Sequence, residues 1–211
     1  MQLVEQHVIK KSDSRWKVID DAAFASKNLY NAANYIVRQE FIHDGRYINY
    51  YELHRQMKET DVYQALPAKV SQQVLMLLDK NWHSYFAAMA AYKDNPDNFL
   101  AKPKLPKYKP KQIGRNILIY TIQAISQPKL KQGFIKPSML DIEVKTLQRH
   151  VACVRIVPKK THYIIEVVYE KRESQADVDA SLIAGVDIGL NNLAAVGRGM
   201  PRPYTNRALF P

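Results

Sequence analysis

One short segment near the end of the chain sets a single carboxylate between apolar residues. Apolar runs at residues 183–186 and 193–196 lie on either side of Asp187 and Gly189. An ionised carboxylate in an apolar strand is costly to bury unless it is paired or bound to a cation. The glycine two residues later allows a ligand to approach the backbone closely. We therefore predict that Asp187 is a catalytic metal ligand, one of several carboxylates that would hold Mg²⁺ for phosphodiester cleavage.

Two other interpretations of Asp187 stay open from its spacing alone. The aspartate can stand at a strand end, facing solvent or capping the turn that follows. An Asp-x-Gly sequence after an apolar strand also begins the phosphate-binding site of actin-like ATPases and sugar kinases. The last interpretation predicts a nucleotide-binding fragment, but the sequence offers no second phosphate-binding loop.

A second group of residues is suited to binding phosphates. Residues 99–140 contain nine Lys or Arg and no Asp or Glu, so no neighbouring acid cancels their field. Prolines keep the densest part extended, and Tyr108 and Tyr120 provide aromatic rings for stacking on bases. The alternative is a solvated, flexible lysine loop. The predicted nucleic-acid-binding residues are Lys102, Lys104, Lys107, Tyr108, Lys109, Lys111 and Arg115.

The overall charge supports a polyanionic partner. The chain has 211 residues, a formal net charge of +11 and a pI near 9.6, which is typical of nucleic-acid-binding proteins. Cys153 is the only cysteine, so a zinc site built on several thiols is excluded, and we expect it to be a small buried residue. The six histidines lack metal-ligand spacing, and no phosphate-binding loop or dinucleotide motif is present. Without a signal or transmembrane pattern, we expect a cytoplasmic protein.

The pattern of apolar residues indicates which elements would position these groups. A strand is predicted at residues 2–11, and a helix from Asp20 or Asp21 to about residue 43, ended by Gly45. Asn49 is predicted to cap a short helix through residue 58. Pro67 suits the first turn of a long helix reaching about residue 92.

The second half of the chain has the alternation of β-strands. Strands are predicted at residues 116–122 and 141–145, with a hairpin from 151–157 and 162–169. Residues 171–179 read as a linker, and 183–188 with 193–196 as a final strand pair. The N-terminal strand needs partners from the second half, so we expect an α+β fold in which helices interrupt a small antiparallel β-domain.

Several segments together resemble one protein family. Residues 26–35 (SKNLYNAANY), 66–75 (LPAKVSQQVL), 103–109 (PKLPKYK), 114–116 (GRN), 154–158 (VRIVP) and 185–193 (GVDIGLNNL) are similar to conserved blocks of TnpB, also called OrfB. TnpB is the transposase-associated protein of bacterial insertion sequences. The resemblance covers about residues 1–197.

This resemblance implies an RNA-guided, Mg²⁺-dependent DNA endonuclease that acts in transposition and DNA recombination. It implies an antiparallel β-barrel, an oligonucleotide-binding-like wedge, at residues 1–20 and 99–178. A helical recognition insert would occupy residues 21–98, and residues 179–211 would begin a ribonuclease-H-like RuvC domain. Guide RNA and target DNA would be the partners, with base pairing reading the sequence and the protein reading shape and backbone. Asp187 alone carries over as a catalytic, metal-binding residue.

The sequence after Gly197 does not resemble the family. Residues 198–211 show no strand pattern, and the family's later Glu, its last Asp and its cysteine zinc ribbon are not found. From this we expect a C-terminally truncated TnpB-like protein that binds RNA or DNA and does not cleave alone. The alternatives are a nuclease-dead repressor or competitor for guide RNA, a non-functional remnant, and the actin-like nucleotide-binding fragment.

Overall fold

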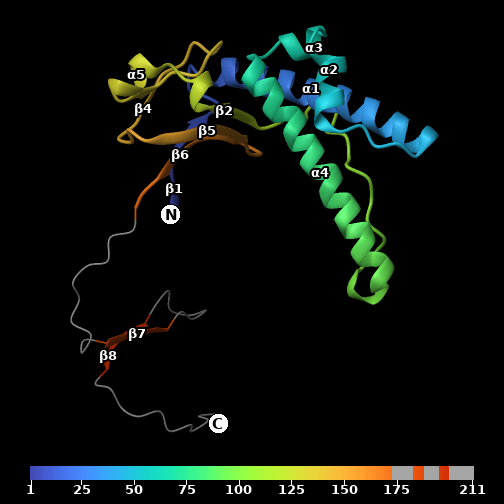
Figure 1. Cartoon of the computed structure of the whole chain (residues 1–211). Helices are drawn as coiled ribbons and strands as arrows, with labels where there is room; N and C mark the ends of the chain where they lie inside the picture. Colours follow the sequence, from blue (N-terminus) through green and yellow to red (C-terminus); the bar gives the residue numbers. More distant parts are fainter. Residues whose placement is uncertain (173–182, 188–194, 200–211) are drawn as a thin grey trace. The chain divides into compact units, whose positions relative to one another are not determined.

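The computed structural model describes residues 1–172, 183–187 and 195–199. The chain divides into two compact units, Met1–Lys171 and Arg172–Pro211. The first unit contains a β-sheet, five α-helices and residues 99–140, which we call the basic stretch, and the second contains one strand pair. Figure 1 shows the helices between residues 16 and 94 grouped next to the sheet, with the short helix at residues 127–131 apart from them.

Four antiparallel strands form the main sheet of the first unit, in the order β1-β6-β5-β2. They are β1 (Gln2–Lys10), β6 (His162–Glu170), β5 (Val151–Pro158) and β2 (Leu118–Thr121). The first strand pairs along its whole length with β6, from Gln2 opposite Glu170 to Lys10 opposite His162. This confirms the predicted N-terminal strand, the predicted hairpin and the need of the first strand for a distant partner.

The edges of this sheet do not join within the described residues. No ladder connects β1 to β2, and the two short strands β3 (Phe134–Ile135) and β4 (Val144–Lys145) pair only with each other. The α+β class is therefore confirmed, with an open antiparallel sheet. The closed barrel stays a prediction.

Helix α1 (Trp16–Asp44) begins earlier than predicted. Arg15 is its N-cap residue, and the Asp13 carboxylate accepts hydrogen bonds from the backbone N–H and the guanidinium of Arg15. The predicted start at Asp20 or Asp21 is wrong because both lie inside the helix. The carboxylate of Asp20 bonds to the distant side chains of Arg115 and Tyr163 instead of capping the helix. The predicted end is confirmed, with Gly45 at φ +65° as the left-handed C-cap.

The remaining helices follow α1 closely. Asn49 caps α2 (Tyr50–Met57) as predicted, its side chain accepting from the N–H groups of Tyr51 and Glu52. The short α3 (Asp61–Gln64) was not predicted. Pro67 directly precedes the long α4 (Ala68–Asp94). Two 3₁₀ turns, η1 (Pro96–Asn98) and η2 (Ile122–Ala124), and α5 (Gln127–Lys131) complete the unit.

One hydrophobic core joins the helices to the sheet. Leu29 of α1, Trp82 of α4 and Ile165 of β6 are fully buried in the same cluster. Phe41, Tyr47 and Phe86 surround Trp82 with ring centroids 5.3 to 5.9 Å away. Residues 1–171 therefore form one compact unit, and its division into a wedge and a recognition insert stays a prediction.

The second unit contains one antiparallel strand pair. Strands β7 (Ile183–Asp187) and β8 (Ala195–Gly199) pair from Ile183 opposite Gly199 to Asp187 opposite Ala195. The predicted strand pair is thus confirmed, although β8 starts later than expected. Its connection at 188–194, most of the predicted linker and residues 200–211 lie outside the described residues. The RuvC assignment stays a prediction.

No helix in the described part of the chain combines the length and the apolar character needed to cross a membrane.

Candidate nucleic-acid interface

Residues 102–117, which we call the basic arm, connect η1 to β2. They lie along α1 and run in the opposite direction to it, since Pro106 bonds near the end of the helix and Asn116 near its start. The green segment beside α1 and α4 in Figure 1 includes this arm. A flexible lysine loop would lack such contacts, so the structure favours a fixed arm.

Four polar side chains of α1 hold the backbone of the arm. Lys27, Asn31, Asn34 and Arg38 are four, three and four residues apart, which places them on one face of the helix. We call them the clamp row. Their backbone acceptors on the arm are the carbonyl oxygens of Lys111, Lys109 and, for both Asn34 and Arg38, Pro106, at 2.7 to 3.0 Å.

The clamp is tightest at its two asparagines. Asn31 makes a paired contact, donating to the Lys109 carbonyl and accepting from the Lys109 N–H, each at 2.9 Å. Asn34 is fully buried and also accepts a hydrogen bond from the Trp82 indole N–H at 3.2 Å. The arm, α1 and α4 are therefore tied together through one side chain.

Lys27 is a structural residue that the sequence alone did not single out. It is 2% exposed, its Nζ lies 3.7 Å from the centroid of the Phe24 ring, and it donates to the Lys111 carbonyl at 2.7 Å. Burial, followed by the positive charges of Arg115 and Lys111, lowers the pKa of Lys27. The only feature of the sequence that indicates this role is the position of Lys27, one helical turn before Asn31.

The C-terminal end of the arm is fixed by an ion pair. Arg115 donates two hydrogen bonds to the Asp20 carboxylate, at 2.8 and 2.7 Å, and Tyr163 donates a third at 2.7 Å. These contacts lower the pKa of Asp20, with the Arg115 hydrogen bond as the main cause. Arg115 also lies over the Phe24 ring, 4.9 Å from its centroid. The Asp20 carboxylate on α1 therefore joins the arm, through Arg115, to β6, through Tyr163.

Gly114 lies in a tight turn of the arm. Its N–H donates to the Pro110 carbonyl at 3.0 Å. A Cβ at this position would lie 2.3 Å from the Pro110 oxygen, so no other residue fits without moving the backbone.

The structure divides the seven predicted nucleic-acid-binding residues into two groups. Lys102, Lys104, Lys107 and Lys111 are exposed, and we call them the arm lysines. Tyr108 is 43% exposed, with the Arg38 guanidinium carbon 5.1 Å from its ring centroid. These five side chains are accessible to a ligand.

Lys109 and Arg115 belong to the other group. The Nζ of Lys109 lies 5.2 Å from the centroid of the Tyr30 ring, and burial lowers its pKa. Arg115 is held by Asp20 as described above. Both side chains contribute to the fold of the arm, and their charges are less available to a phosphate than those of the arm lysines.

Tyr120 does not present an aromatic face to a ligand. It is fully buried in β2, and burial raises the pKa of its hydroxyl. The expectation that it stacks on bases is therefore wrong, because alternation along β2 directs it into the core. Cys153 is only partly buried, so the expectation of a small core residue is also corrected.

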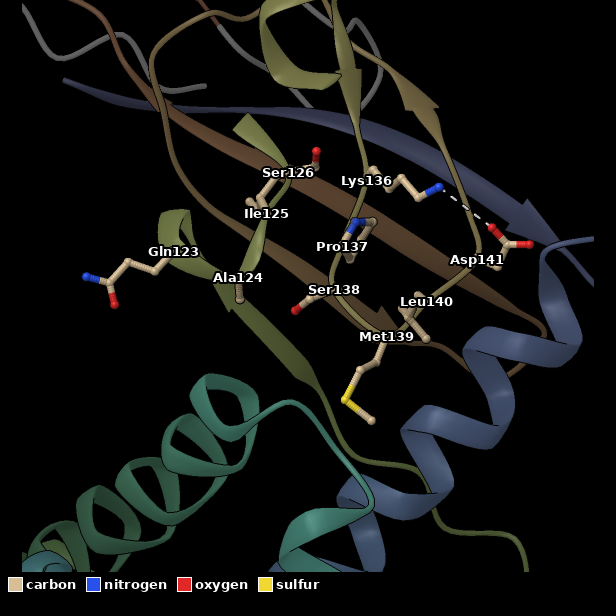
Figure 2. A pocket seen from close by; sticks show the side chains of 10 residues that line it. All are labelled: Gln123, Ala124, Ile125, Ser126, Lys136, Pro137, Ser138, Met139, Leu140 and Asp141. Atoms are coloured by element: carbon tan, nitrogen blue, oxygen red, sulfur yellow. Dashed lines mark ion pairs between the residues drawn. The ribbon is translucent and has the colours of Figure 1, made fainter. Parts of the chain in front are cut away.

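Two pockets lie near the basic stretch. One, which we call the arm pocket, measures about 380 Å³ and is formed between α1, α4 and the arm. The other, about 590 Å³, is lined by residues 123–126 and 136–141. Figure 2 shows Lys136 and Asp141 facing each other at one end of this second pocket, with Nζ and Oδ1 3.8 Å apart.

Asp187, the predicted metal ligand, is the last residue of β7 and pairs with Ala195. No group of three His, Cys, Asp or Glu side chains suited to a metal ion occurs among residues 1–172, 183–187 and 195–199. The role of Asp187 as a metal ligand stays a prediction.

No model of a known protein family and no curated protein matches this chain.

Proposed function

We propose that this chain is a nucleic-acid-binding protein that holds RNA or DNA along the basic arm. One observation carries the proposal. The clamp row of α1 binds the arm through its backbone carbonyls and leaves the arm lysines exposed. A fixed row of cations loses less conformational freedom on binding a strand than a flexible loop would.

The electrostatics of the arm support a phosphate ligand. The arm contains no acidic residue, and the chain as a whole carries a net charge of +11. Lysines that contact phosphates release counterions, which gives affinity without sequence preference. Tyr108, exposed beside the arm lysines, adds a ring for stacking.

The finer part of the proposal rests on the motif resemblance. We propose that the chain is related to TnpB/OrfB, with the sheet as the oligonucleotide-binding-like wedge, the helices as the recognition insert and β7–β8 as the first strands of a RuvC domain. Guide RNA and target DNA would then be its ligands. Asp187 would be a Mg²⁺ ligand, but a single carboxylate does not make a two-metal site, so we derive no cleavage step.

The test measures binding of structured RNA and duplex DNA by fluorescence anisotropy over a range of salt concentrations. A variant with all four arm lysines replaced by alanine should bind more weakly. Its plot of log affinity against log salt should become shallower by roughly 3.6 for duplex DNA, since each phosphate contact contributes about 0.9. The matched control replaces four exposed lysines elsewhere in the unit: Lys10, Lys11, Lys159 and Lys160.

Equal slopes for the wild type and the arm-lysine variant would reject the arm as the binding surface. An equal loss of affinity in the arm-lysine variant and in the control variant would indicate attraction by net charge alone. Adding Mg²⁺ tests nuclease chemistry separately: cleavage that disappears in Asp187→Ala would make the chain an endonuclease.

A further inference from the structure

The arm pocket has the size and lining of a small ligand site. Its volume of about 380 Å³ lies within the range of ligand pockets. Helices α1 and α4 form one side and the arm forms the other. Its lining residues are Tyr30, Asn81, Ser84, Tyr85, Ala88, Pro103, Lys104, Pro106 and Lys107.

The helical side of the pocket offers an amide and an aromatic ring. Asn81 donates one hydrogen bond to the Tyr30 hydroxyl at 3.2 Å. A primary amide has a second N–H and a carbonyl oxygen, the pair of groups that reads the edge of a nucleobase. Tyr85 is partly buried, and its ring is fixed by edge contacts with Phe41 and Trp82. A preorganised ring of this kind is suited to stacking on a base.

The arm side of the pocket offers cations. Lys104 and Lys107 line the pocket and are exposed. Pro106 lies between them, and its carbonyl accepts hydrogen bonds from Asn34 and Arg38, both at 3.0 Å. The clamp row therefore holds the two lysines at the edge of the pocket.

None of the described residues that line the arm pocket is acidic. The Asp79 carboxylate on α4 accepts hydrogen bonds from the Tyr47 hydroxyl and the Tyr50 N–H. Asp94 is exposed at the C-terminal end of the helix. An anion that enters the pocket therefore meets two lysines without a carboxylate beside them.

We infer that the arm pocket binds one unpaired nucleotide of a strand that lies along the basic arm. The base lies against Tyr85 and Asn81, and its phosphate lies beside Lys104 and Lys107. This inference rests on the proposed function, and it adds a subsite that selects for a base. A ring and an amide next to two cations match a nucleotide better than an acidic peptide, which lacks the flat aromatic surface.

The test compares two single-stranded probes of equal length and charge, an oligouridylate and an abasic ribose-phosphate strand. Both bind the arm lysines equally, but only the first can fill the arm pocket with a base. The wild type should prefer the oligouridylate by about tenfold, which is within the contribution of one stacked base. Tyr85→Leu, which keeps an apolar side chain in the aromatic cluster, should lose most of this preference without a change in salt slope, and Tyr108→Leu measures the share that stacking on the exposed ring of Tyr108 contributes.

A matched pair of charge variants on α4 gives an independent measurement. Ala88→Glu places a carboxylate in the arm pocket, whereas Ala87→Glu places the same charge on the neighbouring exposed residue outside its lining. Ala88→Glu should reduce the preference for the oligouridylate as much as Tyr85→Leu does. Ala87→Glu should retain that preference and should lower the affinity for both probes by the same factor. Thermal unfolding of both variants checks that each is folded.

The outcomes separate the two proposals. Weak, salt-independent binding of both probes would overturn the proposed function. Salt-dependent binding with no preference for the oligouridylate would leave the function in place and overturn the arm pocket. A phosphorylated acidic peptide that competes as well as the oligouridylate would also overturn the nucleotide assignment.

Discussion

The basic stretch contains two lysine-bearing segments, the basic arm and residues 122–140. The lysines of these two segments have different surroundings. Among the described residues, no ion pair involves any of the four arm lysines. In the second segment, Lys129 pairs with Glu143 at 2.9 Å. Lys136 lies 3.7 Å from Glu143 and 3.8 Å from Asp141. Within residues 99–140, the arm lysines therefore keep their charge free of the observed ion pairs, whereas Lys129 and Lys136 do not.

The pairing of β3 with β4 explains this difference. Ile135 lies opposite Val144, so the next residues of the two antiparallel segments, Lys136 and Glu143, come close together. The acids that neutralise the second segment come directly after the stretch that lacks them. A local absence of acids in the sequence therefore predicts a free positive charge only where no turn brings later acids back.

The largest expected effect comes from breaking the clamp row at Asn34. Asn34→Ala removes the acceptor of the buried Trp82 indole N–H and a donor to the Pro106 carbonyl. Losing two buried hydrogen bonds should lower the free energy of unfolding by about 3 kcal/mol. Urea unfolding measures this change. Tryptic cleavage at Lys104 and Lys107 should become faster, because the arm separates from α1.

The control for this variant is Asn98→Ala, at an exposed asparagine before the arm. It should change the free energy of unfolding by less than about 0.5 kcal/mol. If Asn34→Ala behaves like this control in both measurements, the clamp row does not hold the arm.

A smaller effect is expected from Gly114→Ala. The added Cβ would lie 2.3 Å from the Pro110 oxygen. Relieving such overpacking should lower the free energy of unfolding by about 2 kcal/mol. Because the turn must open, we also expect weaker binding of nucleic acid than in the wild type. Unfolding and anisotropy experiments measure the two effects.

Gly45→Ala is the matched control for the glycine variant. Gly45 has φ +65° and no atom within 4 Å of an added Cβ, so only the backbone preference is changed, at about 1 kcal/mol. Its affinity for nucleic acid should equal that of the wild type. An affinity loss as large as that of Gly114→Ala would show that the arm turn is not the cause.

The sequence predicted most elements of the first unit because each has a local signal. Alternation identified the β5–β6 hairpin, and apolar residues without helical spacing identified β1. Asn49 and Gly45 marked helix ends. Asp20 was misassigned as a cap because a helix start and a long-range ion pair use the same residue type. Only the fold brings Arg115 and Tyr163 to this carboxylate.

The candidate site was predicted in part for a related reason. Composition located the arm lysines, but it does not distinguish an exposed lysine from Lys109, which lies over Tyr30. The arm pocket was missed altogether, since Tyr85 reads as ordinary helix core and meets Lys104 and Lys107 only when the arm folds back along α1. Such long-range contacts have no periodicity that the sequence could display.

The smallest expected effect tests the comparison between the two lysine segments directly. Glu143→Gln removes the acid that pairs with Lys129 and Lys136, and both ion pairs lower the pKa of this carboxyl, Lys129 most strongly. If both freed lysines reach a single strand, the salt dependence of binding should steepen by up to about 1.4, since each phosphate contact contributes about 0.7. Glu170→Gln is the control because it changes net charge equally at an exposed residue outside the observed ion pairs of the described chain. Equal slopes in both variants would mean that the strand follows the arm and does not reach the second segment. A steeper slope in Glu143→Gln alone would extend the binding surface to the β3–β4 turn, with Glu143 limiting how much of the basic stretch a nucleic acid can use.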